Sequence, residues 1–597
     1  MEGKHTQKST INSKFFQIPI EEYEEDMMRE SSKEKKKEIL ELFTTYNKIR
    51  SKDEFDEIGF DLHNACRTGD LELIKILLSE TIEKSREGLT FKIDSTNETA
   101  SLFNAYDDIE ELIIPRTVEH NSTEYLITSI YRTGLNIKTI KFSEDSAVKT
   151  IYKNAFCDSR IEEVYFPENL RELKERWCYR TDNLKKIIIS PSNDQFKFED
   201  DRYLISKSDS NNDEFDTLLF VRRDIKKFSI PSNIKIISSY AFSRSNIETI
   251  FIPSKVTKIC ENAFYDCRNL TKVEIPTNSN LQTIGSNAFS GSKIEEIYFP
   301  ASLRELKEEW CCETGNLKKI IISPSNDQFK FEDDRYLISK SDSNNDEFDT
   351  LLFVRRDIEK FSIPSNIKII SSDAFSRSNI ETIFIPTKVT KICENAFYYC
   401  SNLTNVEIPT NSNLQIIESR AFKWSNIETI FIPSKVTKIC EWVFYDCENL
   451  TKVEIPTNSN LQTIEPFAFS DSNIESIFIP SKVTKICEYA FYDCRNLTKV
   501  EIPTYSNLQI IEPFAFSDSK IESIFIPSKV TKICKHAFCD CENLQMIEIS
   551  EESKLESISS TFNECERSII MIPSSLRKSI NTMVVPGQHL VRFFDRP

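Results

Sequence analysis

IPSKVTKICENAFYDCRNLTKVEIP, residues 252–276, is the stretch of sequence that decides the fold of this chain. Each of its two apolar ends closes with a proline, and the pair Ala263 and Phe264 lies between them. Alternate residues of an extended segment share a face, so we expect Ile250, Ile252 and, after a return of the chain, Phe264 to point into one interior. One such unit cannot bury this apolar face alone, so the pattern predicts stacked copies.

Copies of this unit run along most of the 597 residues, as roughly 18 to 19 occurrences of the motif I-x-x-I-x-I-P. From Ile358 onward the motif starts every 22 to 24 residues, which is a leucine-rich-repeat spacing. Residues 161–293 recur at 294–426, an offset of 133 that indicates a duplication. The phenylalanines midway in each unit alternate between spacings of 22 and 25 residues outside one interruption, so the deeper period is 47: Phe242, Phe264, Phe289, Phe375, Phe397, Phe422, Phe444, Phe469, Phe491, Phe516 and Phe538.

The unit at 252–276 resembles the repeat of the BspA-like leucine-rich-repeat family, and the resemblance covers about residues 109–573. It implies an α/β repeat solenoid with a parallel sheet on one face and short helical or irregular returns. It also implies a binding role, because family members occur among surface and adhesion proteins of bacteria and protists and are mostly known as binders. This chain departs from the family where glycine is frequent, at Cys260, Cys393, Cys440, Cys487 and Cys534.

The pattern divides the chain into three parts. We expect residues 1–100 to form a helical N-terminal region, in which 61–80 resembles the helix pair of one ankyrin repeat and acts as a cap. Residues 101–573 form the solenoid and 574–597 a C-terminal cap. Two inserts, 191–224 and 324–357, replace the Ala-Phe return and read as extended segments joined by a polar turn. Each insert is either an ornamented repeat or a dedicated binding loop.

Charge and hydropathy limit the classes of partner. A formal charge of −18 disfavours nucleic acid, whose binding depends on neutralised phosphates. No stretch approaches the ~18 apolar residues of a membrane span. The first residues lack the apolar core of a secretory signal, so we expect a cytoplasmic protein. The alternative, implied by the resemblance, is the cell surface by a route without a signal peptide; glycans on Asn269 and its copies Asn402, Asn449 and Asn496 would discriminate.

No motif marks a catalytic, cofactor or metal site, and we expect no enzyme activity. Five scattered histidines and nine glycines supply neither paired ligands nor a phosphate loop. The acidic turn that starts at Asp209 lacks calcium-loop features, with Glu214 at the glycine position and Phe220 at the bidentate glutamate position. We expect the cysteine pairs to be buried free thiols, with disulfides within a repeat or a metal as alternatives: Cys260/Cys267, Cys393/Cys400, Cys440/Cys447, Cys487/Cys494 and Cys534/Cys541.

The candidate site follows from strand alternation. If Ile250 and Ile252 point inward, Phe251 points outward, and aromatic and carboxylate side chains alternate at that position, with rings ~9.6 Å apart. One interpretation is a face that binds a protein partner; the other is that the rings cover the sheet beside the stems of Lys272, Lys452 and Lys499. The function is then that of an interaction scaffold or, alternatively, of an adhesin or antigen for host or matrix proteins. The outward residues are Phe251, Glu274, Tyr298, Phe384, Glu407, Phe431, Glu454, Phe478, Glu501, Phe525 and Glu548.

Overall fold

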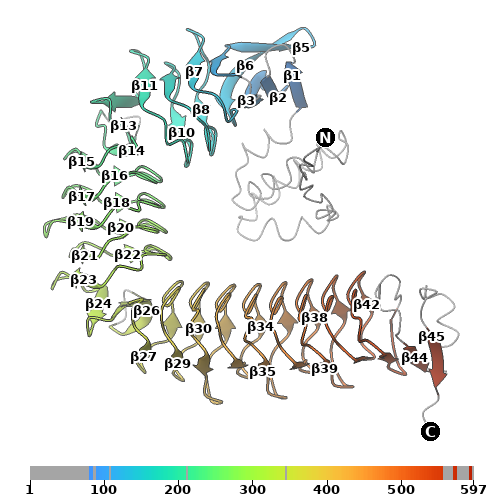
Figure 1. Ribbon diagram of the computed structural model, residues 1–597. Coiled ribbons are helices and arrows are strands. Elements are labelled where there is room, and N and C mark those ends of the chain that lie inside the picture. Colours follow the sequence, from blue (N-terminus) through green and yellow to red (C-terminus); the bar gives the residue numbers. More distant parts are fainter. Residues whose placement is uncertain are drawn as a thin grey trace, which may run out of the picture. The chain divides into compact units, whose positions relative to one another are not determined.

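The computed structural model describes residues 80–84, 89–105, 109–209, 213–342, 346–555, 569–573 and 590–594. In these ranges every helix or strand is a β-strand, and no helix long and apolar enough to cross a membrane is found (Figure 1). Contacts divide the chain into two compact units, Met1–Phe215 with Leu219–Arg223 and Asp216–Leu218 with Asp224–Pro597. We describe each unit by itself.

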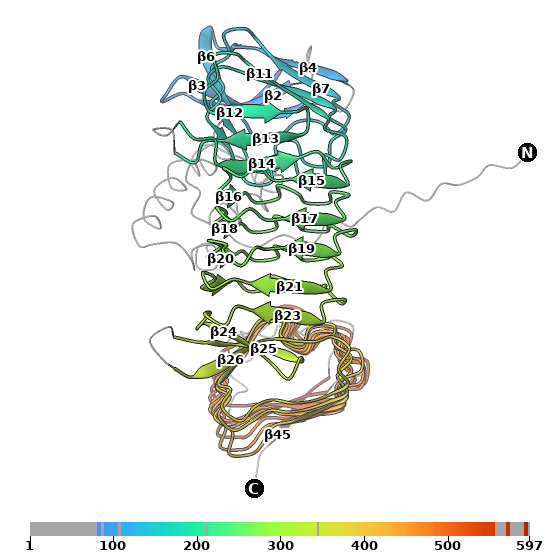
Figure 2. The same cartoon turned by 90° about the vertical axis from the view of Figure 1, so that its left-hand side faces the viewer.

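Each repeat of the second unit contributes one strand to each of two parallel sheets. β17 (Thr249–Phe251) pairs with β19 (Lys272–Glu274), whereas β18 (Lys258–Ile259) pairs with β20 (Thr283–Ile284). We call the sheet that contains β17 the front sheet and the sheet that contains β18 the back sheet. Figure 2 shows these strands stacked rung upon rung.

The expected fold class, an α/β solenoid with a parallel sheet on one face, is wrong for the described repeats. They are all-β, and the chain returns through the strands of the back sheet without a helix. The hydrogen bonding of Cys260 shows why the return is not helical. Its N–H donates to the carbonyl oxygen of Ile237 in the preceding rung, 2.9 Å away. The main chain of the return thus finds its partners along the stack rather than within a helical turn. The result is a solenoid of parallel strands.

The strands that follow β17 on the same side of the second unit form two separate sheets, and we use the name front sheet for both. The first has five strands and the second eleven. They comprise β15 (Lys227–Ser229), β17, β19, β21 (Glu296–Phe299) and β23 (Lys319–Ile322), and then β27 (Lys360–Ser362), β29 (Thr382–Phe384), β31 (Asn405–Glu407), β33 (Thr429–Phe431), β35 (Lys452–Glu454), β37 (Ser476–Phe478), β39 (Lys499–Glu501), β41 (Ser523–Ile526), β43 (Met546–Ile549), β44 (Ile569–Pro573) and β45 (Leu590–Phe594).

The back sheet is built almost entirely from two-residue strands, and the second insert separates its two runs. They are β16 (Ile236–Ile237), β18, β20 and β22 (Glu305–Leu306), and then β28 (Ile369–Ile370), β30 (Lys391–Ile392), β32 (Ile416–Ile417), β34 (Lys438–Ile439), β36 (Thr463–Ile464), β38 (Lys485–Ile486), β40 (Ile510–Ile511) and β42 (Lys532–Ile533).

The inserts form antiparallel strands, which agrees with the extended segments and polar turn expected from their sequence. In the second insert β24 (Phe329–Glu332), β25 (Tyr336–Lys340) and β26 (Phe348–Val354) pair antiparallel, and β26 then pairs parallel with β28. The first insert holds the matching hairpin of β12 (Phe196–Glu199) and β13 (Tyr203–Ser206), followed by β14 (Thr217–Val221). An insert therefore starts a new sheet as well as ornamenting a repeat.

The helical region expected at residues 1–100 is wrong for its described part, which forms β-strands in the first unit. The run Leu89–Asp94 alternates apolar and polar residues, which is a strand period, and forms β2, which pairs antiparallel with its neighbours. The ankyrin-like stretch 61–79 lies outside the described residues. The strands are β1 (Glu80–Lys84), β2 (Leu89–Asp94), β3 (Thr99–Ala105), β4 (Glu111–Ile114), β5 (Thr117–His120), β6 (Thr123–Ile130), β7 (Thr139–Phe142), β8 (Thr150–Ile151), β9 (Glu163–Phe166), β10 (Glu172–Leu173) and β11 (Lys186–Ile189).

The C-terminal cap expected at 574–597 is described only in part. β45 lies inside that range and pairs parallel with β44, so it adds a rung to the front sheet. Residues 574–589 and 595–597 lie outside the described residues.

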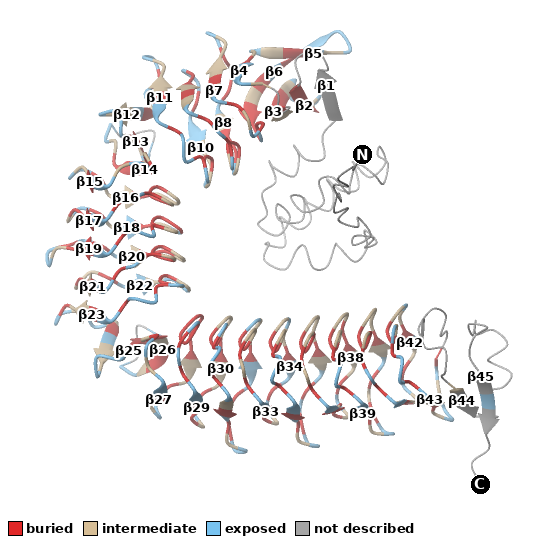
Figure 3. Ribbon diagram, viewed as in Figure 1, coloured by how far each residue is buried: buried red, intermediate tan, exposed pale blue. Residues whose placement is uncertain are grey.

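The interior of the solenoid is a ladder of stacked phenylalanines. Phe444, Phe469 and Phe491 are fully buried, as predicted, and their ring centroids lie 5.1 and 5.2 Å apart. Figure 3 shows the buried residues along the inner side of the coils. Offset stacking of this kind adds to the apolar burial of each ring and ties each rung to the next.

Small polar side chains fill the column beside this ladder. Cys400 donates its thiol hydrogen to the carbonyl oxygen of Phe375, 3.1 Å away. In another rung the hydroxyl of Ser472 donates to the carbonyl oxygen of Phe469, 2.6 Å away. Cysteine and serine therefore occupy equivalent positions in these rungs. No disulfide joins the cysteines of the five pairs. Seven of the ten are buried as expected, whereas Cys260, Cys440 and Cys534 are half-buried.

Candidate partner-binding face

The front sheet places the predicted outward residues on one face. In β33 the side chain of Ile430 is buried, whereas those of Thr429 and Phe431 point outward. Cross-strand register sets each ring beside a carboxylate residue in the next rung. These pairs are Phe251 with Glu274, Phe384 with Glu407, Phe431 with Glu454, Phe478 with Glu501 and Phe525 with Glu548.

The face consists of two columns rather than the single predicted one. Phe251, Glu274 and Tyr298 belong to the five-stranded sheet, and the residues from Phe384 onward belong to the eleven-stranded sheet. The strands β24, β25 and β26 lie between the two sheets in sequence and start the second back sheet. The structure therefore brings together Phe384, Glu407 and the later residues, and leaves Phe251 and Tyr298 in a separate group.

The rings differ in exposure. Phe251 and Phe384 are each 49% exposed, whereas Tyr298, Phe431, Phe478 and Phe525 are half-buried. Phe431 also packs against the core. Adjacent strands lie only ~4.8 Å apart, so side chains of the neighbouring rungs cover part of each ring. The outward direction is confirmed, and the degree of exposure falls in two classes.

The carboxylates between the rings are held by their own strands. Glu274 and Glu454 each form an ion pair of 2.5 Å with a lysine two residues earlier, Lys272 and Lys452. Glu501 is also paired with Lys499. The hydrogen bond and charge of Glu274 raise the pKa of Lys272. Glu407 instead accepts a hydrogen bond of 3.1 Å from the amide of Asn405. These lysines therefore direct their charged ends to the carboxylates.

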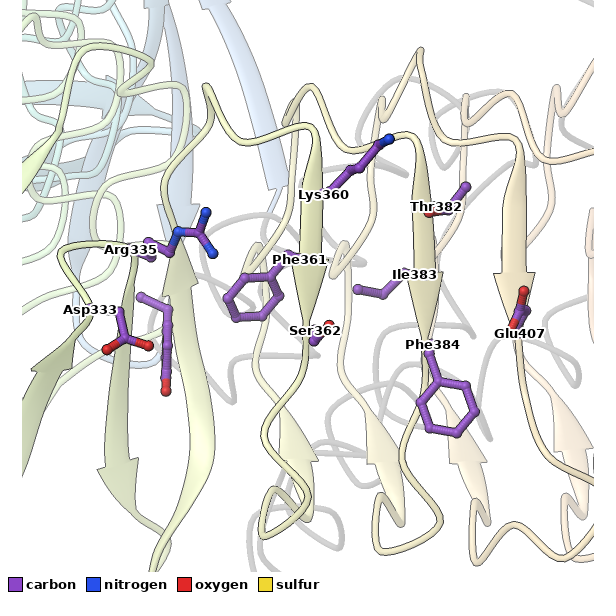
Figure 4. Close-up of a pocket in the computed structure, with 10 residues that line it drawn as sticks. Asp333, Arg335, Lys360, Phe361, Ser362, Thr382, Ile383, Phe384 and Glu407 are labelled. Atoms are coloured by element: carbon purple, nitrogen blue, oxygen red, sulfur yellow. The ribbon is translucent and has the colours of Figure 1, made fainter.

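Two hollows open on this face of the eleven-stranded sheet. One, of about 420 Å³, is lined by Phe384 and Phe431 with Glu407 and Glu454 beside them. The other, of about 410 Å³, lies at the first strand of the sheet and is lined by Arg335 and Tyr336 of the second insert together with Lys360. Figure 4 shows the side chains of Arg335 and Lys360 apart from each other at this hollow. Phe384 and Glu407 line both hollows, so this end of the predicted site forms one continuous region.

A second row of aromatic residues was not predicted. Trp442, Phe467, Tyr489, Phe514 and His536 stack along the turns with centroids 4.2 to 5.1 Å apart, and all five are half-buried. They have left-handed φ values from 55 to 61°, which bulky side chains rarely adopt. The sequence carries their signal in the same 22- and 25-residue spacing, two residues before each core phenylalanine. We call these five residues the turn-edge stack.

Aspartates follow the turn-edge stack four residues later in each rung: Asp446, Asp471, Asp493, Asp518 and Asp540. Burial, and after it the neighbouring carboxylates, raise the pKa values of Asp471 and Asp518 above the ordinary range. Among the described residues no group of three or more histidine, cysteine or acidic side chains has the arrangement of a metal site.

Paired parallel sheets around a phenylalanine ladder define a leucine-rich-repeat solenoid. The chain belongs to the BspA type leucine rich repeat family, whose six-copy repeat region matches residues 98–200, 214–333, 346–466 and 462–584. No curated protein matches the chain.

Solved structures are similar to this chain at low identity. A leucine-rich repeat protein from Bacteroides ovatus is 16% identical with a TM-score of 0.38, over 85% of this chain and 98% of its own. A leucine rich cell surface protein from Faecalibacterium prausnitzii is 20% identical with a TM-score of 0.33, over 79% and 95%. The pneumococcal vaccine antigen PcpA is 14% identical with a TM-score of 0.30, over 86% and 99%.

Proposed function

We propose that this protein is a non-catalytic interaction scaffold that binds a partner protein through the front sheet. The observation that carries the proposal is the hollow between Phe384 and Phe431, in which an exposed ring, a half-buried ring and the carboxylate of Glu407 face solvent together. Exposed aromatic groups on an otherwise polar surface are typical of interaction sites.

The arrangement suits protein binding for physical reasons. The rings are fixed on short hydrogen-bonded strands, so a partner that covers them orders little new structure. Alternating carboxylates are already paired with Lys452 and Lys499 or with Asn405, and their position in register favours one alignment of the partner over others. Affinity would come from the rings and specificity from the polar groups between them.

The test replaces Phe431, Phe478 and Phe525 together with serine. A protein captured by the wild-type chain is identified by mass spectrometry, purified, and measured against the variant by surface plasmon resonance. We expect at least a tenfold loss of affinity with an unchanged circular dichroism spectrum. The matched control replaces Ile416, an exposed apolar residue of the back-sheet strand β32, and should bind as the wild type does. Undiminished binding by the triple variant contradicts the proposal.

The alternative role is that of a surface adhesin or antigen that binds host or matrix proteins. One observation favours it: Asn269, Asn402, Asn449 and Asn496, each in an N-L-T sequence, are all exposed and would accept glycans. We nevertheless propose the cytoplasm, because the free thiols suit a reducing compartment. Glycans at these asparagines, or removal of the protein from intact cells by protease, would establish the surface role instead.

A further inference from the structure

The first strand of the eleven-stranded sheet has an open edge. β27 pairs with β29 on one side and has no strand partner on the other within the described residues. The hollow of about 410 Å³ lies against this side. Tyr336, the first residue of β25, also lines the hollow, with its ring 5.2 Å from that of Phe361 in an edge-to-face contact.

The main chain of β27 directs unused hydrogen-bonding groups into this hollow. The carbonyl oxygen of Glu359 accepts from Glu381 on the β29 side. Successive residues of a strand alternate sides, so the groups of Phe361 also point to β29, and those of Lys360 and Ser362 point to the open side. Unpaired main-chain donors and acceptors at a sheet edge are a template for another strand.

Two cations and two carboxylates line this hollow, and the cations are the ones nearest the open strand. Arg335 and Lys360 line the hollow and are exposed, and neither forms an ion pair within the described part of the chain. Of the two carboxylates, Asp333 lies below Arg335 and away from Lys360 (Figure 4), and Glu407 lies two strands further into the sheet, in β31, where the side-chain amide of Asn405 donates to it. Arg335 is fixed by the hairpin turn, where Asp333 and Asp334 have φ of 54 and 55°, and by Arg355, whose guanidinium donates to the Asp334 carbonyl oxygen, 2.9 Å away.

We propose that an extended acidic segment of a partner protein adds to the open edge of β27 as a further strand. Its main chain bonds to Lys360 and Ser362, and an acidic side chain lies between Arg335 and Lys360. Tyr336 and Phe384 flank it as apolar contacts. This is strand addition, in which main-chain bonds supply affinity and side-chain contacts supply specificity. The proposal rests on the proposed function, because the hollow is the first part of the same face.

The experiment measures fluorescence anisotropy of a labelled hexapeptide of alternating glutamate and valine against the full-length chain. Three peptides serve as comparisons: one with lysine for glutamate, and two with N-methyl groups on alternate amides in the two possible phases. We expect the acidic peptide to bind at least tenfold more tightly than the lysine peptide. One N-methyl phase should bind at least tenfold more weakly than the other, because only one face of the added strand bonds to β27.

Variants locate the site. Arg335→Ala with Lys360→Ala should lower the amount of peptide bound. Because Arg202 and Lys227 repeat these residue types in the duplicated block, a variant with all four replaced should lose binding. The matched control, Lys255→Ala with Lys388→Ala, removes two exposed lysines elsewhere and should bind normally.

Four results would overturn the proposal: no binding of the acidic peptide, equal binding of the lysine peptide, indifference to both N-methyl phases, or unchanged binding by the Arg335/Lys360 variant. The outcome is separable from that of the proposed function. The variant at Phe431, Phe478 and Phe525 leaves the edge of β27 intact and should still bind the peptide. If the triple variant loses partner capture but the wild-type chain does not bind the acidic peptide, the proposed function stands and only the strand addition is refuted.

Discussion

Cys447 donates its thiol hydrogen to the carbonyl oxygen of Phe422, 3.2 Å away in the neighbouring rung. The same carbonyl oxygen accepts from Ser425 at 2.6 Å, so one main-chain acceptor joins the cysteine and serine columns. Such shared bonds link each rung to its neighbour through buried groups, which makes the small side chain of this column a structural requirement.

The buried thiols predict a loss of stability in alkali. Burial raises the pKa values of Cys447 and Cys494 to about 12, from an ordinary value of 9.0. A folded-state pKa above the unfolded value stabilises the protein below pH 9, and this stability is lost as the pH rises from 9 toward 12. Denaturant unfolding monitored by circular dichroism should show this decline.

Serine variants test the origin of that decline. Cys447→Ser with Cys494→Ser should reduce the alkaline loss and leave stability at pH 7 nearly unchanged, because serine fills the same column in alternate rungs. An equally steep decline in this variant would exclude the thiols as the cause.

Phe469→Ala should destabilise the protein by about 3–5 kcal/mol in the rungs around it. The ring is fully buried and stacks on Phe444 and Phe491, so truncation leaves a cavity in the ladder. Contacts along a solenoid are mainly between neighbours, so hydrogen exchange should rise near residue 469 and much less at the ends. An unchanged thermal transition would mean that this column does not anchor the core.

Substitutions at Tyr489 should follow backbone geometry. Its φ is 55°, a region that asparagine adopts readily and β-branched residues avoid. Asn262 and Asn395 occupy the corresponding turns with φ of 56 and 55°. Tyr489→Asn should therefore cost less than Tyr489→Val, for which about 1–3 kcal/mol is expected. Thermal unfolding gives the order, and a more stable valine variant would contradict the strain argument.

Asp373 predicts a second pH dependence. Burial first, and then the nearby Glu309, raise its pKa from 3.8 to about 7, and the thiol of Cys312 lies 3.6 Å from its carboxylate. The protonated form fits the folded state better, so stability should fall as the pH rises from about 4 through 7.

Asp373→Asn removes the titrating group while keeping the shape of the side chain. This variant should show a flatter dependence in urea unfolding and exceed the wild type in stability at pH 8. If the two proteins lose stability in parallel between pH 4 and 7, Asp373 is not responsible.

Alternation within each I-x-x-I-x-I-P motif predicted the buried isoleucines and the outward rings, because both depend on residues close together in the sequence. The regular spacing of the phenylalanines between the motifs predicted their buried column. The repeat length predicted stacking, and the stacked strands then placed Phe384 beside Glu407. The turn-edge stack carried an equally periodic signal, but the left-handed turns that bring its rings together are visible only in the fold.

Tertiary structure alone decided the back sheet, because strands such as Lys258–Ile259 are too short to produce a period of their own and exist only by pairing with the next rung. It also decided that the outward column is divided in two, since the start of a sheet depends on which strands pair. The hollow at β27 has the same origin: Tyr336 and Phe361 come together through the hairpin of the second insert, a contact that no local pattern specifies.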